Sequence, residues 1–148
     1  MFSFKNVPDN SHYKNHWWFG SSTPWDLMGG RELRVGSAFK YIFRYRDKGK
    51  PIEDVKKALV ALNHYFDRPI PLLERFEAWR AKRVADIAVK HAENRYLSPE
   101  KTFIHPGGGV RVELPELRAL IRLYWGDIRG AQKEIETLLE ELEKGQDD

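Results

Sequence analysis

The chain has 148 residues, of which 41% are hydrophobic and 32% charged, and this composition excludes an intrinsically disordered protein. It contains no cysteine, which excludes a disulfide framework, cysteine-ligated metals and thiol catalysis. The net charge of +3 is unevenly placed, because residues 1–50 hold nine Lys/Arg and four Asp/Glu whereas residues 101–148 hold seven and ten. The basic front favours an anionic partner, although solvated helix faces explain this distribution equally well.

The N-terminal region carries no apolar stretch of the kind found in signal peptides. No segment approaches the ~20 apolar residues that a membrane span needs. We therefore expect a cytoplasmic protein without a membrane partner. Residues 1–22 contain Trp17-Trp18-Phe19 and are expected to form an ordered loop, since so many aromatic side chains are rarely left in water.

The next part of the chain predicts three helices. Thr23 and Pro24 are typical of a helix start, and Gly29-Gly30 ends that first helix. The second and third helices are expected over residues 34–47 and 51–66. Their apolar faces recur at helical spacing and consist of Val35, Ala38, Phe39, Ile42 and Phe43, then Val55, Ala58, Leu59, Leu62 and Phe66. These helices are expected to pack as one compact unit over residues 1–68.

The second half predicts a helical arm over residues 69–148. A fourth helix is expected over residues 72–96, and its buried side is expected to consist of Leu73, Phe76, Val84, Ile87 and Ala88. Residues 101–113 are typical of a small β-hairpin. The last helix is expected to run unbroken from Pro115 to Gly145, with a coiled-coil seam of heptads from Leu117 to Leu142.

The seam needs a partner helix. We expect the last helix to pair with the fourth as a long antiparallel hairpin, and the alternative is a homodimer through the Leu117–Leu142 helix. The predicted fold is therefore mainly all-α: a three-helix unit, a helical hairpin and a β-hairpin insertion.

The strongest candidate for chemistry lies on the second helix. Ser37, Lys40, Arg44 and Lys48 occur at i, i+3, i+7 and i+11, so cationic side chains one turn apart could hold one phosphate group. Tyr41 lies between them and could stack on a base. Composition alone favours the alternative of an amphipathic helix with solvated Lys and Arg.

Four motifs in succession resemble a known family: Ser11-His12-Tyr13, Pro24-Trp25-Asp26-Leu27, Gly36-Ser-Ala-Phe-Lys40-Tyr41-Ile-Phe-Arg44 and Ile52-Glu53-Asp54-Val-Lys56-Lys57-Ala58. They are similar to a domain of small tailed-bacteriophage proteins of unknown function. That domain is in turn similar to the C-terminal part of a phage deoxynucleoside monophosphate kinase without a Walker motif. The resemblance covers residues 11–66. It departs at Ser37, where the family commonly has Asn, and the kinase's cysteine-bearing N-terminal region has no counterpart.

The resemblance implies a set of site residues: His12 and Asp54 for catalysis, Lys40 and Arg44 for phosphate, Tyr13 and Tyr41 for stacking or packing, and Glu53 and Lys57 as supporting residues. The helical spacing adds Lys48 and Ser37 as phosphate contacts. No protein metal site is expected, although a nucleotide would bring Mg²⁺ to the carboxylates. Structural explanations stay open beside these roles. Glu53 and Asp54 suit the first turn of a helix, and His12 and Tyr13 suit a packed corner.

Three functions remain open at this point. The first is nucleotide binding by a kinase-like enzyme of phage nucleotide metabolism. The second is a non-enzymatic phage factor that binds nucleic acid, such as DNA, through its basic front and assembles through the heptad helix. The third is an inhibitor that binds a host protein during takeover of the infected bacterium, whose cytoplasm is the expected location. The first two share a phosphate ligand, which makes phosphate binding the leading hypothesis.

Overall fold

The fold is known here from a computed structural model, which describes residue 28 and residues 31–45, 49–96, 103–104, 111–112 and 114–146. The predicted loop over residues 1–22, the predicted helix from Thr23 to Gly30 apart from Met28, and the turn of the predicted β-hairpin lie outside these residues. The described part is α-helical except for two short strands, which confirms the mainly all-α prediction. None of its helices is both long and apolar enough to cross a bilayer.

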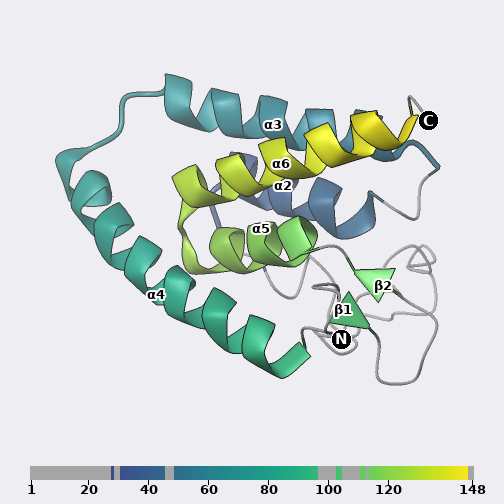
Figure 1. The fold of residues 1–148 in the computed structure, drawn as a ribbon. Helices are drawn as coiled ribbons and strands as arrows, with labels where there is room; N and C mark the ends of the chain where they lie inside the picture. The colour runs from purple at the N-terminus through teal and green to yellow at the C-terminus, as the bar shows by residue number, and fades with distance from the viewer. Residues whose placement is uncertain are drawn as a thin grey trace, which may run out of the picture.

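Five helices and two strands follow one another along the described chain (Figure 1). They are α2 (Leu33–Arg44), α3 (Pro51–Asp67), α4 (Leu72–Tyr96), β1 (Phe103–Ile104), β2 (Arg111–Val112), α5 (Leu114–Trp125) and α6 (Ile128–Gln146). The strands pair antiparallel, with Phe103 opposite Val112. The bounds predicted for the third and fourth helices are confirmed to within one residue.

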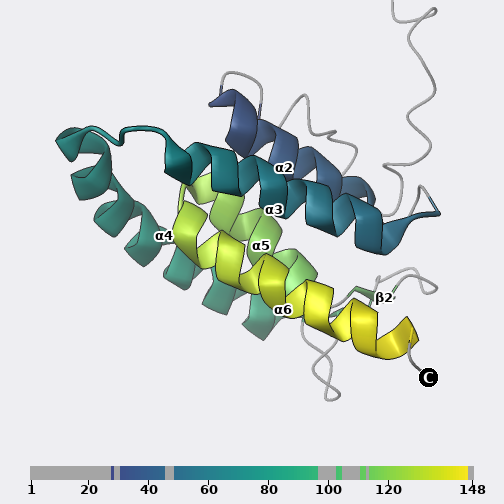
Figure 2. The ribbon, with the colours of Figure 1, turned by 90° about the horizontal axis from the view of Figure 1, so that it is seen from above.

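The helices pack in sequence-adjacent antiparallel pairs. α2 packs on α3, α5 packs on α6, and α6 lies along α3. α5 also contacts α2 and α4. α4 packs mainly on α5 and is the outermost helix of the bundle (Figures 1 and 2). One side of α4 is therefore left without a helix of the described chain against it.

The core lies between α2, α3, α5 and α6. The predicted apolar face of α2 is confirmed, because its five members are all buried, and the Phe39 and Phe43 rings stack with centroids 5.7 Å apart. α3 contributes Val55, Ala58 and Leu62, again as predicted. α5 and α6 complete the same core with Leu120, Leu123, Ile135 and Leu138, among others. The segments before and after residue 68 thus share one hydrophobic core.

The prediction of one unbroken last helix is wrong, because the chain reverses direction at Gly126. This glycine has φ of +90°, which only glycine adopts at little cost. Its N–H donates to the Leu123 carbonyl at 3.3 Å, and the N–H of Asp127 donates to the Arg122 carbonyl at 2.8 Å. This pair of hydrogen bonds is the Schellman motif that ends α5.

A new helix begins directly after this turn. The Gly130 N–H donates to Asp127 Oδ1 at 3.1 Å, so Asp127 caps α6. α6 then returns along α5 and α3 instead of continuing outward. Most residues of the predicted heptad seam are consequently buried in the chain's own core, including Leu117, Ile135 and Leu138. The seam therefore does not form the single long hairpin predicted with the fourth helix, although its first part, α5, packs on α4. The homodimer through Leu117–Leu142 stays a prediction.

The predicted buried side of α4 is also wrong. Leu73, Phe76 and Ile87 have exposed fractions of 69%, 68% and 71%. The buried residues are instead Ala85, Val89 and Ala92, which lie on the opposite side of the helix. Their small side chains let α4 approach α5 closely, and the burial pattern of α4 follows side-chain size rather than hydrophobicity.

Two arginines of α5 fix this orientation of α4. Arg122 donates to Asp86 Oδ1 at 2.7 Å, and Arg118 donates to Glu93. Turning the large apolar side chains of α4 inward would move both carboxylates away from α5 and leave the two guanidinium groups without these partners. The ion pairs and the alanine face therefore specify the same orientation.

Candidate functional site

Three of the site residues predicted on α2 and α3, Ser37, Tyr41 and Lys57, line a groove between these two helices. The groove encloses about 460 Å³ and is lined by Leu33, Arg34, Ser37 and Tyr41 of α2 and by Lys57, Val60, Ala61 and His64 of α3. We call it the α2–α3 groove. Its residues recur every three or four positions on each helix, so they lie beside the buried faces that hold α2 and α3 together.

Three positive side chains gather around the ring of Tyr41. Lys40 Nζ lies 5.2 Å, Arg44 Cζ 4.9 Å and Lys57 Nζ 5.9 Å from the ring centroid. A cation over an aromatic face gains about 0.5–1 kcal/mol at an exposed site, which offsets part of the mutual repulsion of the three charges. The structure thus brings Lys40, Tyr41, Arg44 and Lys57 together, as the sequence motifs indicated.

The protein's own carboxylates neutralise part of this charge. Arg44 Nε lies 3.8 Å from Asp54 Oδ2, and Asp54 is buried, with an exposed fraction of 4%. Asp54 therefore has a partner within the protein, and the geometry gives no support to the catalytic role predicted for it. Lys57 pairs with Glu53 at 3.6 Å, as an exposed pair one helical turn apart. Lys40 has no ion pair within the described residues.

The lining of the groove combines apolar and cationic side chains. Leu33 and Val60 are exposed apolar residues, with exposed fractions of 80% and 53%. Arg34, Lys57 and His64 supply its nitrogen atoms, Ser37 and Tyr41 supply hydroxyl groups, and no described lining residue is a carboxylate. Such a surface can hold a flat ring against its apolar wall and an anion at its cationic end. Sequence reasoning missed Leu33, Val60 and His64, because the sequence of one helix does not indicate which residues of the neighbouring helix will lie beside it.

Three predicted site residues, His12, Tyr13 and Lys48, lie outside the described residues. Ser37 lines the groove together with Tyr41. Arg34, which sequence reasoning did not single out, pairs with Glu32 at 2.9 Å, and the Glu32 carboxylate also accepts the Arg34 and Val35 N–H groups that begin α2. Among the described residues, no group of three His, Asp or Glu side chains could hold a metal ion.

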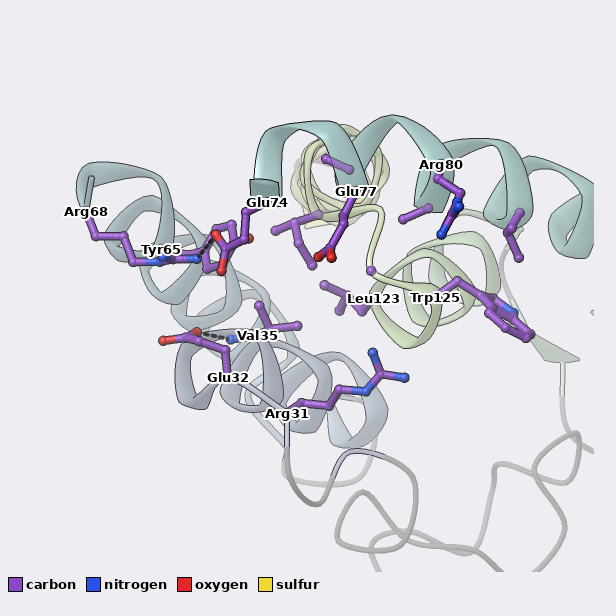
Figure 3. A pocket seen from close by; sticks show the side chains of 15 residues that line it. Arg31, Glu32, Val35, Tyr65, Arg68, Glu74, Glu77, Arg80, Leu123 and Trp125 are labelled. Carbon is purple, nitrogen blue, oxygen red and sulfur yellow. Dashed lines mark hydrogen bonds and ion pairs between the residues drawn. The ribbon is translucent and has the colours of Figure 1, made fainter. Parts of the chain in front are cut away.

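A second cavity separates the first half of α4 from the rest of the protein (Figure 3). It encloses about 470 Å³, and we call it the α4 cleft. In Figure 3 the side chains of Arg31, Glu77 and Arg80 point into it, and Trp125 lies at one end. Its lining comes from several separate segments of the chain, so sequence reasoning gave no sign of it.

The charges of the α4 cleft are balanced. Three arginines and three glutamates line it, and two of the glutamates already have partners. Arg68 donates to Glu74 at 2.8 Å, which raises the arginine pKa, while Glu32 caps α2. Burial and the Glu74 carboxylate raise the pKa of the neighbouring Tyr65 phenol, so it stays neutral. The α4 cleft therefore lacks the cationic excess that distinguishes the α2–α3 groove.

The chain matches no protein-family model, no curated protein and no solved structure. The similarity to the phage domain accordingly remains a resemblance of four motifs within residues 11–66. The function is therefore argued from the chemistry of the α2–α3 groove.

Proposed function

We propose that the protein binds a nucleotide, or a similar molecule that carries a phosphate on a flat ring system, in the α2–α3 groove. The observation that carries this proposal is the gathering of Lys40, Arg44 and Lys57 around Tyr41, beside a groove whose described lining contains no carboxylate. Like charges repel each other, and a phosphate bound among them would be attracted by all three.

The phosphate is expected to lie in the groove beside Lys57 and near Lys40, whose ammonium group lies at the Tyr41 ring just outside the groove lining. Lys40 has no described ion-pair partner, and Lys57 has only an exposed one, so both can turn toward an anion at small cost. Arg44 is expected to bind phosphate more weakly than the motif implied, because its guanidinium is already paired with Asp54. The ring of the ligand would lie against Leu33 and Val60, while Tyr41 orients the cations.

The proposal concerns binding and stops short of a reaction. A phosphoryl transfer requires a group that accepts the proton of the attacking hydroxyl, commonly a carboxylate. No described residue that lines the groove is a carboxylate, and Asp54 is buried against Arg44. The kinase-like function indicated by the phage resemblance therefore rests on residues outside this groove.

Calorimetric titration tests the proposal with deoxynucleoside monophosphates, inorganic phosphate and a 12-nucleotide single strand as separate ligands. The wild type should bind at least one monophosphate and should melt at a higher temperature in its presence, since a ligand that binds only the folded state stabilises it. The Lys57→Ala variant should bind about tenfold more weakly, because a charge-assisted contact contributes about 1.5–3 kcal/mol.

Lys56→Ala is the matched control, because Lys56 neighbours Lys57 on α3 but faces Glu143 of α6, at 3.9 Å. Its affinity should equal that of the wild type. Equal losses in the two variants, or the absence of binding by every ligand, would contradict the proposal. If the single strand binds far more tightly than any monophosphate and weakens steeply with salt, the ligand is nucleic acid and the nucleotide proposal is wrong.

A further inference from the structure

Large apolar side chains are concentrated on the outer surface of α4. Among the described residues, nine large hydrophobic side chains are exposed, and six of them belong to this helix. They are Leu72, Leu73, Phe76, Trp79, Val84 and Ile87. A contiguous exposed apolar surface of this kind marks a binding surface more often than it occurs by chance.

Five of these side chains form a stripe on the face that points away from the bundle, whereas Val84 lines the α4 cleft. With about 100° of rotation per residue, Phe76 lies about 180° from Ala85, which is buried against α5. Leu72, Trp79 and Ile87 lie within about 60° of Phe76 on the same face. We call this face the outer stripe, and it extends over about 22 Å from Leu72 to Ile87 at 1.5 Å per residue.

The contacts on the inner side of α4 prevent the helix from rotating to bury the outer stripe. The helix is held by Ala85, Val89 and Ala92 and by the ion pairs from Arg122 and Arg118 on its inner side. Its first half has little contact with the rest of the protein, since every residue from Pro71 to Arg80 except Glu74 is exposed. The bulky side chains are thus presented outward by a helix whose orientation is fixed.

The stripe is cationic as well as apolar. Arg83 lies within it, and its guanidinium is 5.2 Å from the centre of the Trp79 ring, while Arg80 lies at the edge between the stripe and the α4 cleft, which it also lines. The nearest carboxylates are Glu77 and Asp86, at its edges, and Asp86 already binds Lys82 and Arg122. Tryptophan and arginine at the centre of an apolar surface are the residues that dominate binding energy in protein interfaces.

We propose that the outer stripe of α4 docks another protein, through a contact surface that is apolar and carries carboxylates. The charge of the stripe calls for this chemistry, because carboxylates would pair with Arg80 and Arg83 while apolar groups cover Phe76 and Ile87. A groove or helix of about 22 Å is long enough to cover the stripe, as in helix-in-groove recognition.

Two other occupants fit the stripe less well. A lipid surface favours basic residues at the flanks of an apolar face, whereas Arg80 and Arg83 lie near its middle and would be pressed into the hydrocarbon. A second copy paired antiparallel over the full length from Leu72 to Ile87 would bring the Arg80 side chains of the two chains close together near its centre, where they repel. A protein partner that carries carboxylates would neither press the arginines into hydrocarbon nor place like charges side by side.

The test uses a 20-residue amphipathic helical peptide with a leucine face flanked by glutamates. Its binding is measured by fluorescence anisotropy at 0.15 M salt. The full-length protein should bind it at least tenfold more tightly than the same peptide with glutamines, and it should not bind a lysine version. The double variant Phe76→Gln/Ile87→Gln should lose at least tenfold in affinity. Since both side chains are exposed, this variant should fold normally, which its circular dichroism checks.

Val60→Gln is the matched control, because Val60 is an exposed apolar residue of α3, outside the stripe. It should leave peptide binding unchanged, while it weakens any ligand of the α2–α3 groove, so this proposal and the proposed function fail independently. Equal binding of the three peptides would overturn the docking proposal. So would preferential binding to vesicles that contain phosphatidylserine, or a dimer in sedimentation equilibrium that the double variant abolishes.

Discussion

Arg122→Met should destabilise the protein strongly, because this guanidinium joins three elements at once. Arg122 Nη1 lies 2.7 Å from both Asp86 Oδ1 and Asp127 Oδ2, and Nε lies 3.6 Å from Glu134 Oε1. Methionine keeps most of the aliphatic stem and removes the charge. Of the three carboxylates, Asp127 is the most deeply buried, with an exposed fraction of 4%.

The expected loss is about 3 kcal/mol of unfolding free energy. Removing one partner of a buried ion pair costs about 3–5 kcal/mol, since the other charge stays buried without compensation. The lower end applies here, because Asp127 keeps its hydrogen bond from the Gly130 N–H. Asp86 adds little, being partly exposed and still bound to Lys82.

The loss should depend on pH. Burial raises the pKa of Glu134, and Arg122 and Arg118 counteract this shift. Without Arg122 the Glu134 pKa rises further above its unfolded value, so the ionised side chain destabilises the variant at neutral pH. Protonation then restores stability as the pH falls through that raised pKa. In the wild type, hydrogen bonds from Lys82 and Arg122 lower the pKa of Asp86, so its contribution is present above pH 3.8 and disappears only below it.

Urea unfolding followed by circular dichroism at pH 7 and pH 5 measures both effects. The gap between wild type and Arg122→Met should be about 3 kcal/mol at pH 7 and smaller at pH 5. Arg75→Met, at an exposed position of α4, is the control and should change the free energy by less than about 0.5 kcal/mol. A loss below about 1 kcal/mol at pH 7, or an equal gap at both pH values, would refute the reasoning.

Two glycine substitutions should have opposite effects on stability. Gly126→Ala should cost about 1–2 kcal/mol, because φ of +90° strains an L-residue although the new Cβ would only touch Ala81 Cβ, at 3.6 Å. Gly36→Ala should stabilise by about 0.5–1 kcal/mol, because Gly36 lies inside α2 and no described atom lies within 4 Å of the new Cβ. Thermal and urea unfolding would measure both, and equal signs would contradict the backbone argument.

Periodicity predicted the inner helices well and the outer helix poorly. α2 and α3 each bury one face, so apolar residues at helical spacing identify the core directly, as with Phe39 and Leu62. α4 carries apolar residues on two opposite faces. The sequence reading chose the bulky ones, whereas close packing against α5 selected Ala85 and Ala92. Hydrophobicity alone does not reveal which of two apolar faces packs inside the protein.

The break at Gly126 could have been found in the sequence. Trp125-Gly126-Asp127 combines a glycine suited to end one helix with an aspartate suited to cap the next. The regular heptads across it hid this signal, since Leu123, Ile128 and Ala131 are buried on both sides of the turn. The pairing of antiparallel helices preserves the apolar spacing that a single coiled-coil helix would show.

The candidate groove was predicted in part. Lys40, Tyr41 and Lys57 were named from motifs and do lie together. The Arg44–Asp54 pair was not foreseen, because an aspartate in the first turn of a helix is usually a solvent-exposed charge rather than a buried partner.

The first half of α4 carries the outer stripe on one side and forms a wall of the α4 cleft on the other. Its attachment there is light, since Arg68 and Glu74 make the main polar link to α3. A protein that binds the outer stripe and displaces this half-helix would change the width of the α4 cleft on the other side. By thermodynamic reciprocity, a molecule that fills the cleft would change the affinity for that protein by the same factor. Two surfaces on opposite sides of α4 would thus be coupled through the position of a single half-helix.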